Sequence, residues 1–213
     1  MEPKILEEIM QESAPGPRPA FGTIHLLRAI LLIGKEAPIG RKNLSVKLSL
    51  GAGSVRTLIQ RLKNNKLICE RKHGCDLTET GSKLCLILMS RISETMVIEA
   101  GRLSLGRWNV AILVRGVAGK ISAGLEQRDA AIKIGATGAN TIIYSSGKFI
   151  VPRGCTDCAA EYPDNTWDRL RTNLSPNDGD VIIVSGGPSH AIAENGALAA
   201  AWTFITDQMP DFI

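Results

Sequence analysis

Residues 41–65 constrain the fold of this chain most, because they join two helix-forming runs through a glycine-rich turn. Residues 41–50 predict a short helix, and residues 51–53 predict a tight turn in which glycine can adopt positive φ. Ser54 is a candidate N-cap for a longer helix over residues 54–65. A short helix, a turn and a longer helix in this order indicate a helix-turn-helix.

The longer helix has two chemically different faces. Apolar residues recur at the spacing of a buried stripe: Val55, Leu58, Ile59 and Leu62. The other positions carry side chains suited to base edges and phosphates: Arg56, Thr57, Gln60, Arg61, Lys63 and Asn64. We therefore predict that this helix enters the major groove of DNA.

A basic hairpin follows the helix. Residues 67–72 and 75–78 predict two short strands around a His73-Gly74 turn. Residues 38–83 contain 10 basic and 3 acidic residues, and the resulting charge of +7 suits contacts with phosphate. The predicted DNA-binding residues are Arg41, Lys42, Ser54, Arg56, Thr57, Gln60, Arg61, Lys63, Asn64, Arg71, Lys72 and His73.

Residues 23–90 resemble the winged-helix domain of MarR- and ArsR-like bacterial and archaeal regulators, on the segments NLSVKLSLGAGSVRTLIQRLKNNKLI and LTETG. The whole chain resembles archaeal predicted transcriptional regulators that join such a domain to a C-terminal α/β domain of unknown function. The resemblance implies DNA binding. Winged helices also serve as protein-interaction modules, and a charged helix face is often only solvated, so both alternatives stay open.

Charge divides the chain into two parts. Residues 1–106 carry 16 Lys and Arg against 10 Asp and Glu, whereas residues 107–213 carry 9 against 11. One basic and one mildly acidic half suggest two domains with different partners. We predict an N-terminal segment (1–19), a winged helix (20–100), a linker (101–107) and an α/β domain (108–213).

Composition excludes several classes of protein. The longest apolar run, residues 24–33, is interrupted by His25 and Arg28 and is too short for a membrane span. The N-terminus lacks the basic-then-apolar order of a secretory signal. Five cysteines are too few for a disulfide scaffold, which favours a reducing compartment. We therefore expect a cytoplasmic protein with no membrane partner.

Residues 82–99 predict a helix that is apolar nearly all round. Such a helix needs a cover beyond the core of one small domain. A second copy of the chain would supply it, and a homodimer would match a two-fold symmetric operator. The alternative is that this helix is an interdomain core element.

Residues 108–206 alternate β-branched runs with alanine-rich stretches in the order β-α-β-β-α-β-α. The first six elements match a split βαβ arrangement. We therefore predict an α+β protein with two domains, in which a winged helix precedes a βαββαβ (ferredoxin-like) α/β domain with an extra C-terminal helix. A three-layer sandwich with a mixed sheet is the alternative.

Two glycine-rich turns, residues 115–120 and 185–190, follow predicted strands. Such turns can bind an anion through backbone N–H groups, although neither is a Walker loop or a G-x-G-x-x-G motif, and plain turn glycines are the alternative. The predicted ligand-binding residues are Arg115, Gly116, Gly119, Lys120, Arg128, Ser185, Gly186, Gly187, Ser189, His190 and Glu194.

Cys155 and Cys158 form a C-x-x-C motif, which can bind zinc, carry a redox disulfide or do neither. The other cysteines and histidines show no second paired spacing that would complete a zinc site. A plain surface loop is the main expectation, and we predict no metal and no cofactor.

These features predict a DNA-binding transcriptional regulator whose C-terminal domain senses a small anionic metabolite. The expected partners are double-stranded DNA, a small-molecule effector and a second copy of the chain. The alternative is an enzyme that acts on a phosphorylated substrate and uses the winged helix as an accessory. We expect no enzyme, because no nucleophile or acid–base pair can be identified in the sequence.

Overall fold

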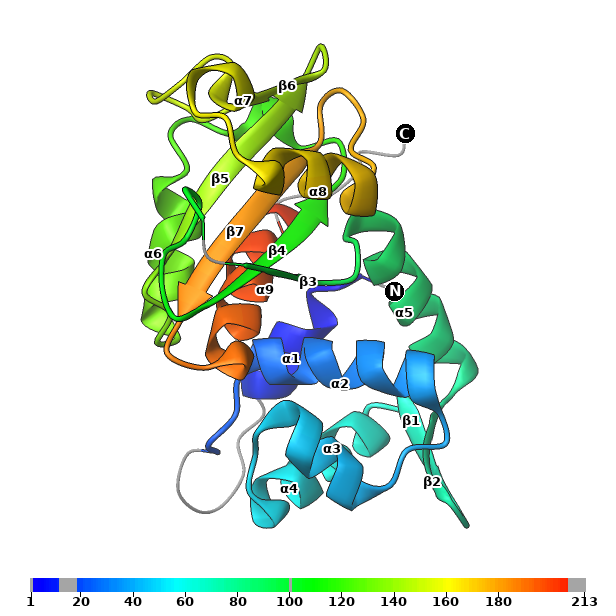
Figure 1. The fold of residues 1–213 in the computed structure, drawn as a ribbon. Helices are drawn as coiled ribbons and strands as arrows, with labels where there is room; N and C mark the ends of the chain where they lie inside the picture. The colour runs from blue at the N-terminus through cyan, green and yellow to red at the C-terminus, as the bar shows by residue number, and fades with distance from the viewer. Residues whose placement is uncertain (1, 12–18, 100, 207–213) are drawn as a thin grey trace, which may run out of the picture. The chain divides into compact units, whose positions relative to one another are not determined.

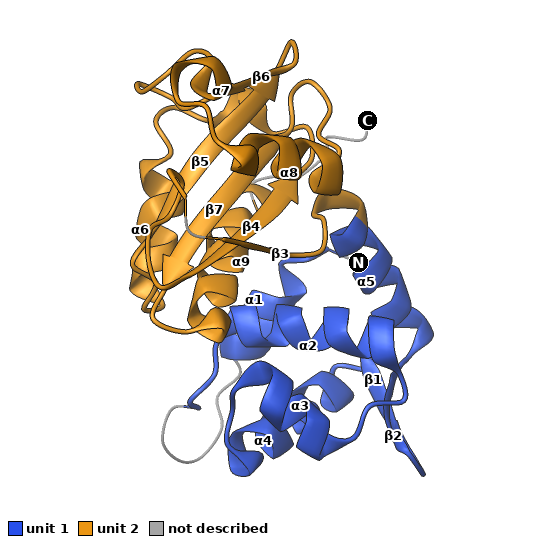
Figure 2. Ribbon diagram, in the orientation of Figure 1, with its two compact units in different colours: residues 1–89 blue, residues 90–213 orange. Residues whose placement is uncertain are grey.

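The computed structural model describes residues 2–11, 19–99 and 101–206, and the chain divides into two compact units (Figures 1 and 2). Unit 1 (residues 1–89) is mainly helical, and unit 2 (residues 90–213) is built on a five-stranded sheet. The protein is therefore a two-domain α+β protein. No helix within the described ranges is long and apolar enough to cross a membrane.

Unit 1 consists of helices around a small apolar core, with one two-stranded hairpin. Its elements are α1 (Ile5–Gln11), α2 (Thr23–Glu36), α3 (Arg41–Leu48), α4 (Ala52–Asn64), β1 (Ile68–Arg71) and β2 (Gly74–Leu77), followed by α5 (Glu79–Arg91). The predicted apolar stripe of α4 is confirmed, since Val55, Leu58, Ile59 and Leu62 are all buried. The helix begins earlier than predicted, at Ala52, with Gly51 as its N-cap.

The β1–β2 hairpin is held against the segment that precedes α3. Ile39 and Cys75 exchange two backbone hydrogen bonds, of 2.8 and 3.0 Å. Gly74 has a φ of +145°, and a Cβ there would lie 2.5 Å from the carbonyl carbon of Ile39. Glycine alone tolerates both the positive φ and the close approach of the Ile39 backbone. Gly74 therefore allows the hairpin to lie beside the start of α3.

Unit 2 contains a fully antiparallel sheet. Its strands are β3 (Met96–Ile98), β4 (Trp108–Val114), β5 (Gly138–Ser145), β6 (Lys148–Ile150) and β7 (Val181–Gly187). They lie in the order β3-β4-β7-β5-β6, and each pair of neighbours is antiparallel.

This topology shows that the predicted ferredoxin-like arrangement is wrong. That arrangement would place the strand at residues 148–150 inside the sheet, parallel to β4. The observed β6 is three residues long, begins with an exposed lysine and lies at the sheet edge, where charged residues are common. The apolar β7 occupies the centre, between β4 and β5.

Helices cover both faces of this sheet, which gives three layers (Figure 1). Helices α6 (Leu125–Lys133) and α9 (His190–Thr206) pack on one face. On the other face, α8 (Asn165–Leu174) contributes Trp167, Leu170 and Leu174 to a core with Ala111, Leu113 and Ile182. The layers of the alternative prediction are confirmed, but the sheet is antiparallel and not mixed.

The helix predicted over residues 82–99 is shorter than expected. It ends at Arg91, and residues 96–98 form β3, which pairs with β4. The boundary between the two units accordingly falls between Met89 and Ser90, before the predicted linker. The apolar character of residues 96–98 belongs to a sheet edge and not to a helix.

The predicted linker, residues 101–107, is an ordered loop fastened to the sheet. Asn109, only 2% exposed, accepts hydrogen bonds through Oδ1 from the N–H groups of Leu105 (2.7 Å) and Gly106 (3.2 Å). Its Nδ2 donates to Ser104 Oγ (2.8 Å) and to the carbonyl of Gly106 (2.9 Å). One buried amide thus fixes the entry into β4.

The start of α2 generates a prediction about pH. His25 Nδ1 accepts a hydrogen bond from the Gly22 N–H at 3.2 Å. Burial, and to a lesser extent the charge of Arg28, lower the pKa of His25 below its ordinary value of 6.5. Protonation therefore favours the unfolded chain. We expect the contribution of His25 to the free energy of unfolding to be constant above pH 6.5. It should decrease as the pH falls below that value.

The control is His25→Asn, which retains an acceptor at the cap but does not titrate. Urea unfolding measured across this pH range should show a smaller pH dependence in the variant than in the wild type. Identical pH profiles for the two proteins would contradict the assignment to His25.

Candidate functional site

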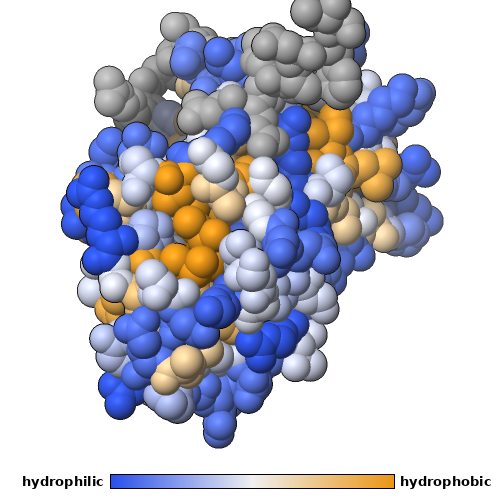
Figure 3. Space-filling view, turned by 90° about the horizontal axis from the view of Figure 1, so that it is seen from above, coloured by the Kyte–Doolittle hydropathy of each residue, from blue (hydrophilic) through white to orange (hydrophobic). Residues whose placement is uncertain are grey.

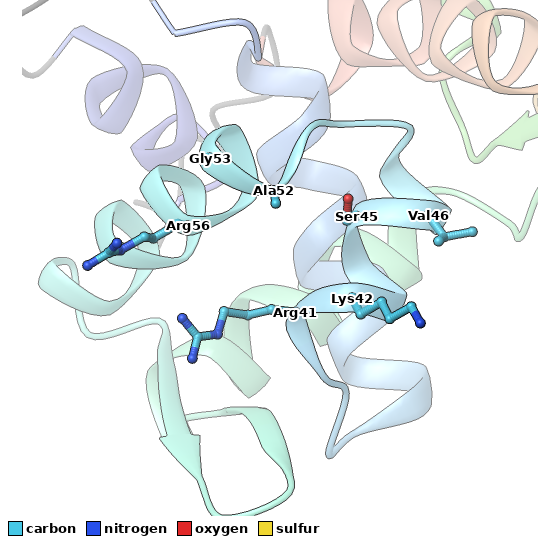
Figure 4. Close-up of a pocket in the computed structure, with 7 residues that line it drawn as sticks. All are labelled: Arg41, Lys42, Ser45, Val46, Ala52, Gly53 and Arg56. Carbon is cyan, nitrogen blue, oxygen red and sulfur yellow. The ribbon is translucent and has the colours of Figure 1, made fainter.

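A basic surface is formed by α3, α4 and the β1–β2 hairpin of unit 1. Between α3 and the first turns of α4 lies a groove of about 510 Å³, lined by Arg41, Lys42, Ser45, Val46, Ala52, Gly53 and Arg56. Arg41 and Arg56 extend to the same side in the close-up, and Lys42 extends to the other (Figure 4). Ala52 and Gly53 carry no large side chain, so this part of the lining leaves room for a partner.

The exposed face of α4 carries most of the polar side chains predicted from the sequence. Arg56, Gln60 and Lys63 follow one another along this face and are exposed. Gln60 Nε2 donates to Asn64 Oδ1 at 2.7 Å, which orders two amide groups on the same surface. Thr57 is exposed and donates back to the carbonyl of Gly53, whereas Ser54 is half-buried and does not cap the helix.

Acidic residues neutralise part of this surface. Lys63 pairs with Glu70 at 3.0 Å, and its hydrogen bond and charge, with a smaller contribution from Arg41, lower the pKa of Glu70. Arg71 pairs with Asp76 at 3.3 Å. Arg56, Lys42 and Lys72 form no ion pair within the described part of the chain.

The hairpin tip continues the basic surface. Arg71, Lys72 and His73 are all exposed. A second hollow, of about 250 Å³, lies between the tip and the start of α3, and Arg41 borders it as well as the first groove. Arg41 therefore connects the α3–α4 groove with the hairpin.

The prediction that Arg61 lies on the exposed face of α4 is wrong. Its side chain is 8% exposed and donates hydrogen bonds to the carbonyls of Ile9 (2.7 Å) and Met10 (3.3 Å). These carbonyls lie at the C-terminal end of α1, where backbone acceptors lack helical partners and a cation is favourable. The guanidinium also lies over the ring of Phe21. Arg61 fastens α1 to α4.

The two glycine-rich turns of unit 2 lie at opposite ends of the sheet. Because β4 and β7 are antiparallel, with Trp108 opposite Gly187 and Val114 opposite Val181, the turn after β4 lies near the start of β7. Seven-residue strands separate the two turns by about 20 Å. The predicted ligand-binding residues of the two turns therefore do not form a single site.

The first turn binds a carboxylate of the chain itself. The Gly116 N–H donates to Asp180 Oδ1 at 2.8 Å, and Arg115 approaches the same carboxylate at 4.0 Å. Asp180 is 4% exposed and also accepts from the Asn177 N–H. The anion bound by this turn is therefore the Asp180 carboxylate, which also anchors the start of β7.

In the second turn the glycines allow close packing. A Cβ on Gly186 would lie 2.6 Å from the Leu105 carbonyl carbon, and a Cβ on Gly187 would lie 2.8 Å from the Ala193 nitrogen. Ser185 is fully buried and donates to the Gly138 carbonyl. These residues join the sheet to the 101–107 loop and to α9.

The remaining predicted ligand residues do not gather in one site. At the start of α9, Ser189 accepts from the Ile192 N–H, and His190 lies 4.0 Å from Glu194 and edge-on to Trp108. Arg128 is exposed and pairs with its neighbour Asp129. Gly119 and Lys120 are exposed on a short 3-10 helix, Ala118–Lys120.

A pocket that the sequence did not indicate lies on the α8 side of unit 2. It has a volume of about 350 Å³ and is lined by Arg102, Leu103, Val151, Cys155, Cys158, Tyr162 and Trp167. Cys155 and Cys158 are joined by a disulfide, so the plain-loop expectation is wrong. No cluster of metal-ligating side chains occurs among the described residues. No pattern in the sequence predicts that Arg102 and Leu103 lie beside the C-x-x-C motif.

The glycine assignment yields a stability prediction with an internal control. Gly186→Ala places a methyl group against the backbone of Leu105, so we expect a loss of about 1–3 kcal/mol in the free energy of unfolding. In Gly119→Ala the added methyl group meets no atom within 4 Å, so the free energy of unfolding should change by less than about 0.5 kcal/mol. Chemical denaturation of both variants measures these two changes in the free energy of unfolding. Equal stabilities would show that Gly186 is not packed as described.

Comparisons with known proteins agree with the two-unit organisation. Residues 23–83 match a family model described as "PH0730-like, N-terminal domain", and residues 105–204 match one described as a domain of unknown function, DUF4443. The chain is similar to the solved structure of a hypothetical protein, PH0730, from Pyrococcus horikoshii OT3. Identity is 27% and the TM-score 0.72, over 88% of this chain and 95% of that chain. No curated protein matches. The two matches thus fall one in each unit, with the PH0730-like match in unit 1 and the DUF4443 match in unit 2.

Proposed function

We propose that the protein is a DNA-binding transcriptional regulator, in which unit 1 acts as a winged helix. In this proposal α4 is the recognition helix and the β1–β2 hairpin is the wing. The observation that carries the proposal is the exposed polar face of α4, which is continuous with basic residues of α3 and of the hairpin. A B-DNA major groove is about 12 Å wide and admits a helix with such a face.

The proposal gives different roles to different side chains. Arg56 and Gln60 lie along the middle of the exposed face, and Arg and Gln pair with guanine and adenine edges. Arg41, beside the groove and the hairpin, is assigned to a phosphate, as are the hairpin residues Lys72 and His73. Arg61 has no role in DNA recognition, because its guanidinium is bound to α1.

Unit 2 is assigned the sensing role, at a site away from the two glycine turns. The two glycine turns are too far apart and are occupied by contacts within the chain. The pocket beside Trp167 has a volume within the usual range for small ligands, and its lining combines apolar side chains with Arg102. We therefore assign to this pocket a small effector with an apolar part and an acidic group.

We further propose a homodimer formed through α5. Leu86 is 67% exposed and Met89 52%, and both are large apolar side chains of this helix. A second copy would cover these two side chains and present two recognition helices to a two-fold operator. Figure 3 shows the surface of the molecule from above, where hydrophobic patches lie between hydrophilic side chains.

DNA binding is tested by salt dependence and by base specificity. An operator is first selected from a random pool of duplexes. Arg41→Ala should reduce the slope of log K against log salt concentration by about 1, because one phosphate contact is lost. Arg56→Ala should weaken operator binding by about 1–3 kcal/mol and relax specificity at one position.

The matched control is Lys133→Ala, which removes an exposed cation from α6 of unit 2. Fluorescence anisotropy titrations across a salt series give both the operator affinity and its dependence on salt concentration. Operator affinity that is independent of salt, or equal in the Arg41, Arg56 and Lys133 variants, would reject the proposed interface.

The dimer is tested by charge insertion. Leu86→Lys puts a charge into the proposed interface, where burial of an unpaired charge is unfavourable, so the variant should be monomeric. Ile132→Lys, at a 47% exposed apolar position of α6, is the control and should leave the assembly unchanged. Sedimentation equilibrium measures the mass. A monomeric wild type, or a dimeric Leu86→Lys variant, would contradict the proposal.

A further inference from the structure

The C-x-x-C disulfide lies in the wall of the pocket in unit 2, where a small molecule can reach it. Both cysteines line the pocket together with Trp167, Tyr162 and Arg102. We propose that Cys155 and Cys158 form a redox site that exchanges with small thiols carrying a carboxylate. This inference depends on unit 2 alone, so it stands or falls independently of DNA binding by unit 1.

The short sequence separation of the two cysteines means that their disulfide contributes little to the stability of the fold. A disulfide stabilises chiefly by restricting the unfolded chain, and the effect increases with the length of the closed loop. Cys155 and Cys158 are three residues apart in sequence, so the loop is very short. The crosslink therefore restricts the unfolded chain little.

Other contacts hold the two cysteines together without the crosslink. The Val151 N–H donates to the Cys155 carbonyl at 3.0 Å. Glu161 Oε1 accepts from the N–H groups of Thr156 (3.2 Å) and Asp157 (3.4 Å), the two residues between the cysteines. The Cα atoms of the cysteines are 5.2 Å apart. After reduction the two thiols stay adjacent, so the disulfide can form again.

The two sulfurs differ in their surroundings. Cys155 precedes the short helix α7 (Cys158–Glu161) and is 9% exposed. Cys158 is 1% exposed, belongs to the core with Phe149, and its Sγ lies 3.6 Å from the Cys155 carbonyl oxygen. An incoming thiolate therefore reaches Cys155 first.

The exchange is balanced in two steps. The thiolate of a small thiol attacks Cys155 Sγ, forming a mixed disulfide, and the Cys155–Cys158 bond breaks with its electron pair on Cys158 Sγ. That sulfur takes up a proton. A second molecule of the thiol attacks the mixed disulfide, releasing the disulfide of the small thiol and a second thiolate on Cys155. Two electrons pass from two small thiols to the protein disulfide.

Arg102 selects the class of thiol. Its guanidinium lies over the Tyr162 ring, 5.8 Å from the centroid, at the border of the pocket. The backbone N–H of Arg102 donates to Asp164 Oδ2 at 3.2 Å, which ties this loop to the start of α8. Asp164 is the carboxylate next to Arg102, and hydrogen bonds from Thr166, with a smaller effect of Arg102, lower its pKa. A carboxylate on the thiol can approach the exposed face of the guanidinium.

The first experiment uses the full-length, air-oxidised protein without denaturant. The protein is incubated with glutathione, alkylated with iodoacetamide and digested, and the Cys155 and Cys158 peptides are identified by mass. We expect reversible reduction with an unchanged far-ultraviolet circular dichroism spectrum. Absence of the disulfide in the oxidised protein, or reduction only after denaturant is added, would overturn the proposal.

Two pairs of variants test the details. With glutathione disulfide, Cys158→Ser should trap a mixed disulfide on Cys155, and Cys155→Ser should trap far less on Cys158; the reverse preference would overturn the assigned order. Arg102→Ala should slow reduction by glutathione by about threefold and leave reduction by the uncharged dithiothreitol unchanged. Equal slowing with both reductants would reject the carboxylate-bearing class. The wild-type experiment decides the proposal if a cysteine variant does not fold.

Discussion

Burial of one face of α4 is the constraint on which the arrangement of unit 1 depends. Once Val55, Leu58 and Leu62 are in the core, the helix must present Arg56 and Gln60 outward. The neighbouring elements are then placed by backbone contacts, above all by the paired Ile39 and Cys75 segments that hold the hairpin beside α3. The basic surface is thus a consequence of how the apolar core is filled.

Unit 2 follows a different constraint, since both faces of its sheet are covered. The strands are apolar on both sides because α8 packs on one face and α6 and α9 pack on the other. The antiparallel order then separates the two glycine turns, and each turn makes contacts within the chain. The pocket lies instead where the 101–107 loop, the C-x-x-C loop and α8 meet.

Features with a local signal in the sequence were predicted correctly. The buried stripe of α4 and the β1–β2 hairpin are two such features. Arg61 was misplaced because it borders the stripe, and only the packing of α1, far away in sequence, decides its environment. Residues 101–107 were predicted as a linker because their attachment depends on the buried Asn109 amide, which no periodic pattern reveals.

Local patterns in the sequence predicted the two-part α+β organisation, the concentration of positive charge in the first part and the order of most helices and strands, because periodicity, turn residues and charge are properties of neighbouring residues. Long-range packing set the strand pairing, the end of the sheet that each glycine turn occupies, the contact of Asp180 with the first turn, and the position of Cys155 beside a pocket with Arg102. These contacts join segments far apart in the chain, and their selection depends on how the whole core packs.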